Sequence, residues 1–325
     1  MALAIERVLR QFWLPGVSTV TGKLNRGLQA FLLDDRYRIF TAPVQNSFEI
    51  TPYEPEEMRR AICHDLSRMA CAAFESSYFL PSPDGLEKSC GWSAIRAYYG
   101  AFFAAHAIIR VFGKTCSQLD SLHLRNISKV SSYTHGAIVN HSAGLYHGQW
   151  DEQNSVLRLS HSSESISGGS HEVTWKIFLD TLSHLRDELL SSNATGMVVD
   201  LQQAAVDLDK FRSGLCEGGF NNGNWLSSIR NRINYRHDFD AWFPYGKSTQ
   251  HYEAIKTTGK QRWLRPPIPL KDIPIRGREL ERVMELSGSI VALCRCLLEH
   301  VGETNSKADS FVKYGPQSLI AIARK

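Results

Sequence analysis

The sequence predicts a mostly α-helical protein, and three observations support this class. Apolar residues recur at helical spacing over residues 55–79, where Met58 and Leu66 share one stripe, and again over residues 277–301. Residues 89–112 are apolar on more than one face, as expected for a helix in the middle of a bundle. The 325-residue chain is 43% hydrophobic and 22% charged, an ordinary globular composition that excludes gross disorder and fibrous repeats.

Local signals define the elements before the central helix. Short helices are predicted over residues 4–13 and 24–40, within an N-terminal extension that we place at residues 1–50. The helix over residues 55–79 begins at Pro55, whose fixed backbone angle suits a first helical turn. Two acidic residues follow at the positive end of the helix dipole.

The stretch after the central helix is less regular in its pattern. A serine-rich segment over residues 160–171 is typical of a loop, and residues 156–159 have the composition of a short strand. We therefore predict an irregular insertion at about residues 114–171 of a helical core.

Helical periodicity returns after the insertion. It predicts helices over residues 173–190, 198–211 and 224–238, before the last long helix. The helical bundle is expected to span residues 51–301, and residues 302–325 to form a C-terminal tail.

Charge and cysteine content limit the functional classes. Lys and Arg number 37 against 33 Asp and Glu, and the net charge of +4 permits a nucleic-acid partner without requiring one. Seven cysteines without a CxxC pair predict free thiols rather than a zinc ribbon or a disulfide framework. We also expect no signal peptide, because charged residues come within the first seven positions, and no membrane span, because the longest apolar stretch, residues 97–109, is short. A cytoplasmic location is expected from these features together.

The densest polar cluster lies within the predicted helix over residues 224–238. Arg230 and His237 are seven positions apart, and on an α-helix seven steps of about 100° return to nearly the same face. Asn234 lies between them on that face, whereas Arg232 lies about 140° from His237. The helix is therefore expected to present a cation, an amide and an imidazole together.

These three groups suit phosphodiester chemistry without a metal. An arginine guanidinium binds two phosphate oxygens and stabilises the charge that develops at phosphorus. A histidine titrates near neutral pH and can move a proton to or from a ribose hydroxyl. We predict no metal site and no cofactor for this reaction.

Two stretches resemble the HEPN domains, the higher eukaryotic and prokaryotic nucleotide-binding family. Arg230-Asn231 followed by His237 is similar to the family signature of an arginine, a polar residue and a histidine a few positions later. Residues 97–107, AYYGAFFAAHA, resemble the aromatic and alanine-rich second helix of these domains. The two stretches also come in the order that the family has.

The resemblance implies a helical bundle that pairs as a homodimer, with the two motif helices facing each other across a cleft. Catalytic members are metal-independent RNA endonucleases that use the ribose 2′-hydroxyl and leave a 2′,3′-cyclic phosphate; many act as toxins or in antiphage defence. By this resemblance Arg230 stabilises phosphate charge, Asn231 positions groups and His237 transfers the proton. The expected partners are RNA and an antitoxin or defence-system protein.

Four further residues are predicted to bind substrate around this site: Asn234, Arg232, Arg236 and Arg96. Two alternatives stay open. One is a catalytically inactive HEPN-like module that binds a nucleotide or a protein; the other is an unrelated helical scaffold whose Arg–His helix is only surface. A scaffold would pair Arg230 with a buried carboxylate and bury His237, whereas an enzyme needs both side chains accessible.

Three other features have both a functional and a structural interpretation. The series His135, His141 and His147 has ligands for zinc or nickel, but its five-residue gaps favour a scattered polar surface. The aromatic run over residues 242–245 either clamps a base or closes the helix as a packed turn. The basic stretch over residues 256–265 either follows a phosphate backbone or is a solvated loop.

Overall fold

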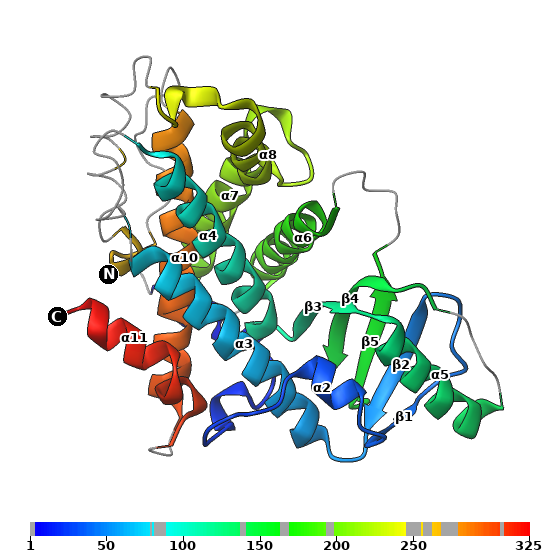
Figure 1. Ribbon diagram of the computed structural model, residues 1–325. Coiled ribbons are helices and arrows are strands. Elements are labelled where there is room, and N and C mark those ends of the chain that lie inside the picture. Colours follow the sequence, from blue (N-terminus) through cyan, green and yellow to red (C-terminus); the bar gives the residue numbers. More distant parts are fainter. Residues whose placement is uncertain are drawn as a thin grey trace.

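The fold is mostly helical, with one small antiparallel sheet beside a helical bundle (Figure 1). This confirms the predicted mostly α class. The computed structural model describes residues 4–78, 80, 89–136, 141–162, 169–192, 198–244, 255, 262–267, 279–305 and 309–325.

Five long helices form the bundle, within the part of the chain that the structure describes. They agree with the predicted helices to within a few residues at most ends. α4 lies at the centre, against α3 on one side and α10 on the other, while α6 and α7 pack as a pair (Figure 1). The helices are α3 (Pro55–Tyr78), α4 (Gly91–Val111), α6 (Gly169–Ser191), α7 (Val198–Leu215) and α10 (Glu279–Thr304).

The apolar pattern of α4 explains its central place. Most of its residues are buried, as expected from the stretch that is apolar on more than one face. Gly100 allows α3 to approach closely, because a Cβ at this position would lie 2.8 Å from the Ser77 hydroxyl oxygen. The two helices therefore pack at a distance that a larger side chain would not permit.

The predicted irregular insertion is wrong for the residues that the structure describes. Strand β3 (Lys114–Leu119), helix α5 (Ser121–His135), strand β4 (Gly144–Asp151) and strand β5 (Val156–His161) occupy it, and β5 contains the short strand expected at residues 156–159. Residues 163–168 of the serine-rich segment lie outside the described residues.

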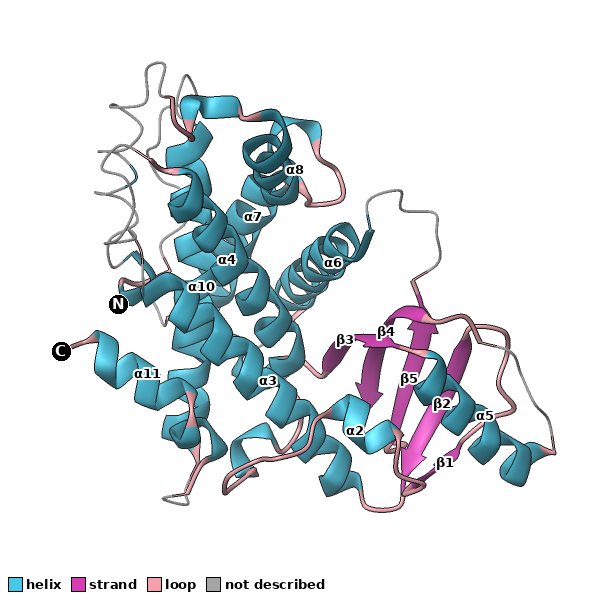
Figure 2. Cartoon of the chain, viewed as in Figure 1, coloured by secondary structure: helices cyan, strands magenta, loops and turns pink. Residues whose placement is uncertain are grey.

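The sheet joins two stretches that are far apart in the sequence. Its order is β1-β2-β5-β4-β3, and every neighbouring pair is antiparallel. Strands β1 (Tyr37–Ile39) and β2 (Ser47–Pro52) come from the N-terminal region, and Phe48 of β2 lies opposite Leu159 of β5. Helix α5 lies against the sheet in Figure 2, and the capping box of Asp120 and His123 starts it.

The predicted helix over residues 24–40 is correct only for its first half. Helix α2 covers Leu28–Leu32, and β1 follows after an acidic turn. Tyr37 and Ile39 are buried while Arg38 between them is exposed, and this alternation has the period of a strand rather than of a helix. Pairing with β2 thus overrides the helical spacing of the residues before it.

The remaining elements complete the ends of the bundle. Helix α1 packs against α7 and α10, and helix α11 packs against α3 and α10. None of the described helices is both long and apolar enough to cross a bilayer. The shorter elements are α1 (Ile5–Val8), η1 (Leu9–Phe12), η2 (Val17–Thr19), η3 (Glu217–Gly219), α8 (Trp225–Asn231), η4 (Arg232–Arg236), η5 (Asp238–Asp240), η6 (Arg262–Leu264), η7 (Phe311–Tyr314) and α11 (Pro316–Ala323).

The cysteines are free thiols, and several lie in the core. Burial raises the pKa of Cys71, Cys90 and Cys296 to about 11. These three thiols are therefore protonated near neutral pH, a state that suits packing rather than nucleophilic attack.

A chain of hydrogen bonds holds the buried imidazole of His106 in its neutral form. The Thr174 hydroxyl donates to the Ser170 carbonyl at 2.9 Å, so it accepts from His106 Nε2 at 3.4 Å. His106 Nδ1 then accepts from the guanidinium of Arg110 at 3.3 Å. Burial and the charge of Arg110 lower the pKa of His106 well below its ordinary 6.5.

We expect this histidine to make the protein less stable in weak acid. The unfolded chain takes up a proton at His106 near pH 6.5, whereas the folded protein does not, so stability falls as the pH drops below that value. The loss from this one group is about 1 kcal/mol between pH 6.5 and 5.5. Urea unfolding at pH 7.5 and 5.5 measures it, and His106→Gln should show a smaller decrease. An equal decrease in both proteins would contradict the assignment.

Candidate functional site

The motif segment is not the continuous helix that its sequence predicts. α8 ends at Asn231, the next residues form the π-helical turn η4, and His237 then adopts left-handed angles, with φ 54°. Seven steps return to one face only on a straight α-helix, so the expectation that Arg230 and His237 leave one helical face is wrong. At this helical end the Ile233 carbonyl accepts a hydrogen bond from the indole of Trp242 at 2.8 Å.

The backbone after the π turn is strained. His237, Phe239 and Asp240 have φ values of 54°, 68° and 49°. Left-handed angles are uncommon for residues other than glycine, and for a bulky phenylalanine they are an outlier. Each costs about 1–3 kcal/mol, and such residues and π turns both concentrate at functional sites.

Arg230 lies half-buried against the aromatic part of α4. Its guanidinium carbon is 5.3 Å from the ring centre of Tyr98 and 6.0 Å from that of Tyr99. Its Nη1 donates to the Asn231 side-chain oxygen at 2.8 Å. Nε is buried and has no hydrogen-bond partner, and no carboxylate of the described residues forms an ion pair with Arg230. The motif thus presents a cation that no protein anion neutralises within the described part of the chain.

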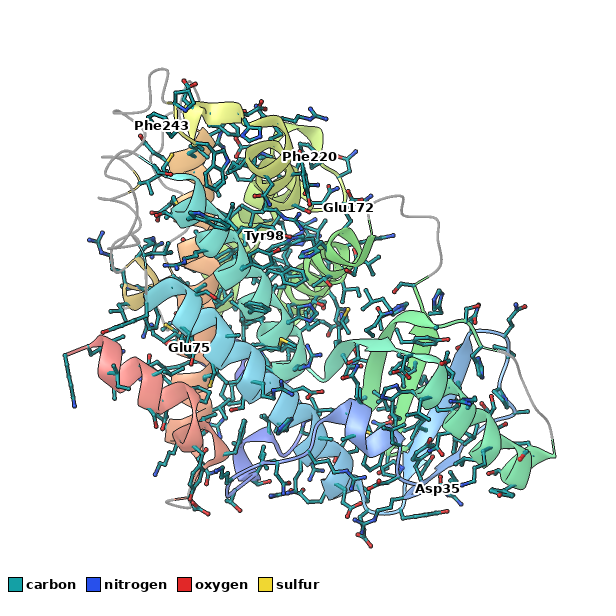
Figure 3. The ribbon with its side chains drawn as sticks, in the orientation of Figure 1. Asp35, Glu75, Tyr98, Glu172, Phe220 and Phe243 are labelled. Atoms are coloured by element: carbon teal, nitrogen blue, oxygen red, sulfur yellow. The ribbon has the colours of Figure 1, made fainter. Side chains whose placement is uncertain are left out.

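Two hydrogen bonds to α6 position the Tyr98 ring of α4 on which Arg230 lies. The indole of Trp175 on α6 donates to the Tyr98 hydroxyl at 3.2 Å, so this hydroxyl donates its own proton to His171 Nδ1 at 2.8 Å. Burial, and then the charge of Arg230, lower the pKa of His171. Figure 3 labels Tyr98 on α4, on the side of the bundle where α6 and α8 lie.

His171 was missed by the sequence reasoning. It stands at the end of the predicted serine-rich loop, with no spacing relation to Arg230. In the structure it belongs to the first turn of α6, and only the packing of α6 against α4 brings it to Tyr98.

Arg232 is a half-buried residue that contacts the strained turn. It forms ion pairs with Asp238 at 2.8 Å and with Glu279 at 3.0 Å, and it lies over the ring of Phe239 at 4.4 Å. These contacts join the motif segment to the start of α10. Its guanidinium is therefore already occupied, unlike that of Arg230.

The other predicted site residues remain near the surface. Asn231, Arg236 and His237 are exposed, and Asn234 is half-buried. Arg96 is exposed on α4. The structure thus joins Arg230, Asn231 and Tyr98 into one contact group and leaves His237 at the end of the π turn.

The aromatic run after the motif combines a packed and an exposed ring. Trp242 packs edge-on against Trp92 at 5.3 Å and donates to the motif backbone, as the packed-turn interpretation expects. Phe243 is 71% exposed, Tyr235 is 74% exposed and Trp92 is 61% exposed. Tyr245, the last residue of the run, lies outside the described residues.

The three histidines that the sequence offered as metal ligands each contact a backbone or side-chain group of the protein. His135 contacts the Ile39 carbonyl at 3.0 Å, His141 accepts from the Asn46 amide at 3.1 Å, and His147 contacts the Ser162 hydroxyl at 3.2 Å. The described residues contain no group of three or more His, Cys, Asp or Glu side chains that could hold a metal ion.

The basic stretch over residues 256–265 is partly internal. Arg262 is buried and ion-paired with Glu285, and Trp263 is buried against Phe74, with ring centres 5.3 Å apart. Neither side chain can follow a phosphate backbone. Arg265 is exposed, whereas Lys256 and Lys260 lie outside the described residues.

Trp242→Phe should destabilise the protein by about 1–3 kcal/mol. The substitution keeps most of the ring but removes the indole N–H, and the partly buried Ile233 carbonyl then loses its hydrogen-bond donor. Urea unfolding measures the change. Trp92→Phe is the matched control and should change stability by less than about 0.5 kcal/mol, because Trp92 is exposed. Equal effects of the two substitutions would show that the hydrogen bond is unimportant.

Comparison with protein-family models finds no match for this chain, and comparisons with curated proteins and with solved structures find none either.

Proposed function

We propose that the protein is a metal-independent RNA endonuclease of the HEPN type, with Arg230 and His237 as catalytic residues. The observation that carries the proposal is that Arg230 has no carboxylate partner among the described residues, while His237 is exposed. The alternative of a purely structural motif instead expects Arg230 to pair with a buried carboxylate and His237 to be buried. The uncompensated cation suits a phosphate.

The proposed reaction is an internal transesterification at the scissile phosphate. His237 accepts the proton of the ribose 2′-hydroxyl, and the 2′-oxygen forms a bond to phosphorus. The bond from phosphorus to the 5′-oxygen breaks, and a protonated group supplies the proton that the leaving 5′-hydroxyl needs. Arg230 stabilises the extra negative charge on the phosphate oxygens.

A homodimer would provide both proton-transfer roles. One imidazole cannot be base and acid in the same step, whereas two motif segments facing each other would supply two imidazoles. We therefore place the active site between two copies of the chain. A toxin or antiphage effector held in check by a partner protein is the corresponding biological role.

The surroundings of Arg230 support its catalytic role. Asn231 accepts a hydrogen bond from the guanidinium, and Tyr98 and Tyr99 hold its flat face. Because Tyr98 is itself fixed by two hydrogen bonds, the arginine is held in place before substrate arrives. Such preorganisation is what electrostatic stabilisation of a transition state requires.

The exposed rings near the motif favour a single-stranded substrate. Trp92, Tyr235 and Phe243 are exposed, and unpaired bases stack on such rings. Arg96 and Arg236 are exposed cations on the neighbouring elements and suit the phosphate backbone. Bases in a duplex are already stacked and cannot use these rings in the same way.

Cleavage of labelled RNA in EDTA tests the proposal. The full-length chain is incubated with a single-stranded RNA and with a folded tRNA, and the product ends are mapped. We expect cleavage of the single strand that leaves a 2′,3′-cyclic phosphate and a 5′-hydroxyl. His237→Ala should reduce the rate at least about 100-fold, whereas His184→Ala, an exposed histidine of α6, should not.

Three results would count against this function. Cleavage that requires added magnesium would contradict the metal-independent mechanism. Cleavage that survives in His237→Ala would contradict the assignment of the base. Intact RNA under all conditions would favour the catalytically inactive module that binds a nucleotide or a protein.

A further inference from the structure

A cavity of about 580 Å³ lies between the bundle and the sheet. Its walls come from α3, α4, the first turns of α6, and β3. Volumes of this size are typical of sites that enclose small organic ligands. The proposed RNA mechanism makes no use of this space.

Arg110 carries an unpaired charge at the wall of the cavity. Its side chain is 2% exposed, and Nη1 and Nη2 donate to the carbonyls of His106 and Cys116 at 2.7 and 2.8 Å. Nε is buried without a hydrogen-bond partner, and no described carboxylate forms an ion pair with this guanidinium. A buried cation whose partners are all neutral costs several kcal/mol unless an anion approaches it.

Asp65 lines the same cavity, but it is not the anion that pairs with Arg110. One carboxylate oxygen accepts the Leu28 amide at 3.1 Å, at the start of α2, and the other contacts His64 Nδ1 at 3.2 Å. The carboxylate lowers the cost of the Arg110 charge from a distance, without a hydrogen bond to it. Its own hydrogen bonds therefore go to other groups.

The charges on the cavity wall leave an excess of one positive charge. Arg68 and Arg110 are cationic and Asp65 is anionic, so the sum is two minus one. His106 and His171 also line the cavity, and burial lowers the pKa of both, so they are neutral at pH 7. One anionic group of a ligand would bring the net charge of the cavity to zero.

One side of the cavity is aromatic and apolar. The ring of Phe102 is 4.4 Å from that of His171, and Phe103 lies half-buried one residue further along α4. Met69 of α3 also lines the cavity. Flat rings pack well against such surfaces, in offset or edge-on arrangements.

We propose that this cavity binds a small organic anion that carries a flat ring. The ring lies against Phe102 and Phe103, and the anionic group faces Arg110 and Arg68. The anion supplies the counter-charge that Arg110 lacks among the described residues. The evidence for this site is a different arginine from the proposed catalytic one, although His171 lines the cavity and also contacts the Tyr98 hydroxyl.

Isothermal titration calorimetry with four simple probes tests the proposal on the full-length chain. Phenyl phosphate and benzoate have a ring and an anionic group, benzyl alcohol has only the ring, and inorganic phosphate has only the charge. We expect one of the ring-bearing anions to bind with one-to-one stoichiometry, at least about tenfold tighter than both controls. Which one binds tells whether the natural ligand carries a phosphate or a carboxylate.

Substitutions at the cavity wall show whether the probe binds in this cavity. Arg68→Gln changes an exposed residue at the cavity and should weaken binding at least about fivefold. Phe103→Ala should weaken it similarly, and Arg110→Gln more strongly where the variant folds. Arg125→Gln, an exposed arginine on α5, is the matched control and should bind as the wild type does.

Two results would overturn the proposal. One is that neither ring-bearing anion binds better than benzyl alcohol and inorganic phosphate. The other is that affinity is unchanged in both Arg68→Gln and Phe103→Ala, which would place binding elsewhere. Neither result depends on whether the chain cleaves RNA, so a failure here is distinguishable from a failure of the nuclease proposal.

Discussion

Arg230→Lys is expected to reduce RNA cleavage at least about 100-fold, although the positive charge is kept. The ammonium of lysine is a point charge and cannot donate two parallel hydrogen bonds to a phosphate. It also lacks the flat group that lies over Tyr98 and Tyr99. The loss should appear in the rate at saturating RNA, because the interaction strengthens in the transition state.

The controls separate catalysis from folding. Arg324→Lys makes the same chemical change at the residue that follows α11, whose side chain is 52% exposed, and it should cleave RNA as the wild type does. Circular dichroism and the unfolding midpoint of Arg230→Lys should remain close to those of the wild type, since the residue is only half-buried. An Arg230→Lys variant that cleaves within about threefold of the wild type would remove Arg230 from the mechanism.

Trp175→Ala should lower the free energy of unfolding by about 3–5 kcal/mol. Trp175 is fully buried on α6, and its ring lies 6.1 Å from the ring centres of Tyr98, Phe102 and Phe178. Truncation leaves a large cavity where α6 meets α4. It also removes the N–H that donates to the Tyr98 hydroxyl. Urea unfolding at neutral pH measures the loss.

Two further variants divide this effect into its parts. Trp175→Phe keeps most of the buried ring and removes the hydrogen bond, so it should cost less than Trp175→Ala by at least about 1 kcal/mol. Trp92→Ala is a matched control at a tryptophan that is 61% exposed, and it should cost about 1 kcal/mol or less. A similar loss in Trp175→Ala and Trp92→Ala would mean that α6 is not part of the main core.

The long helices could be predicted because their information is local. The apolar stripes of α3 and α10 repeat at helical spacing, and the apolar character of α4 on several faces indicates its central position. These features depend on residues three and four positions apart. Tertiary packing then reinforced the same pattern.

The sheet could not be predicted as a unit, because its strands pair over long distances. Phe48 lies opposite Leu159, and no local pattern indicates which distant strand supplies a partner. Short strands such as β1 also carry too few residues for their alternation to outweigh the helical spacing before them. The sequence therefore predicted an irregular insertion and, for residues 24–40, a helix, where the structure has paired strands.

The sequence by itself determined the long helices of the bundle and the presence of Arg230, Asn231 and His237 in one short segment. Tertiary structure decided the shape of that segment, which turns into a π-helical end whose Ile233 carbonyl accepts a hydrogen bond from the indole of Trp242. It also decided which arginine is available to a substrate. Asp238 of η5 and Glu279 of α10 neutralise Arg232, whereas Arg230 meets aromatic rings and the Asn231 amide among the described residues. Glu279 and Tyr98 are far from the motif in the chain, so only folding brings them to these two arginines.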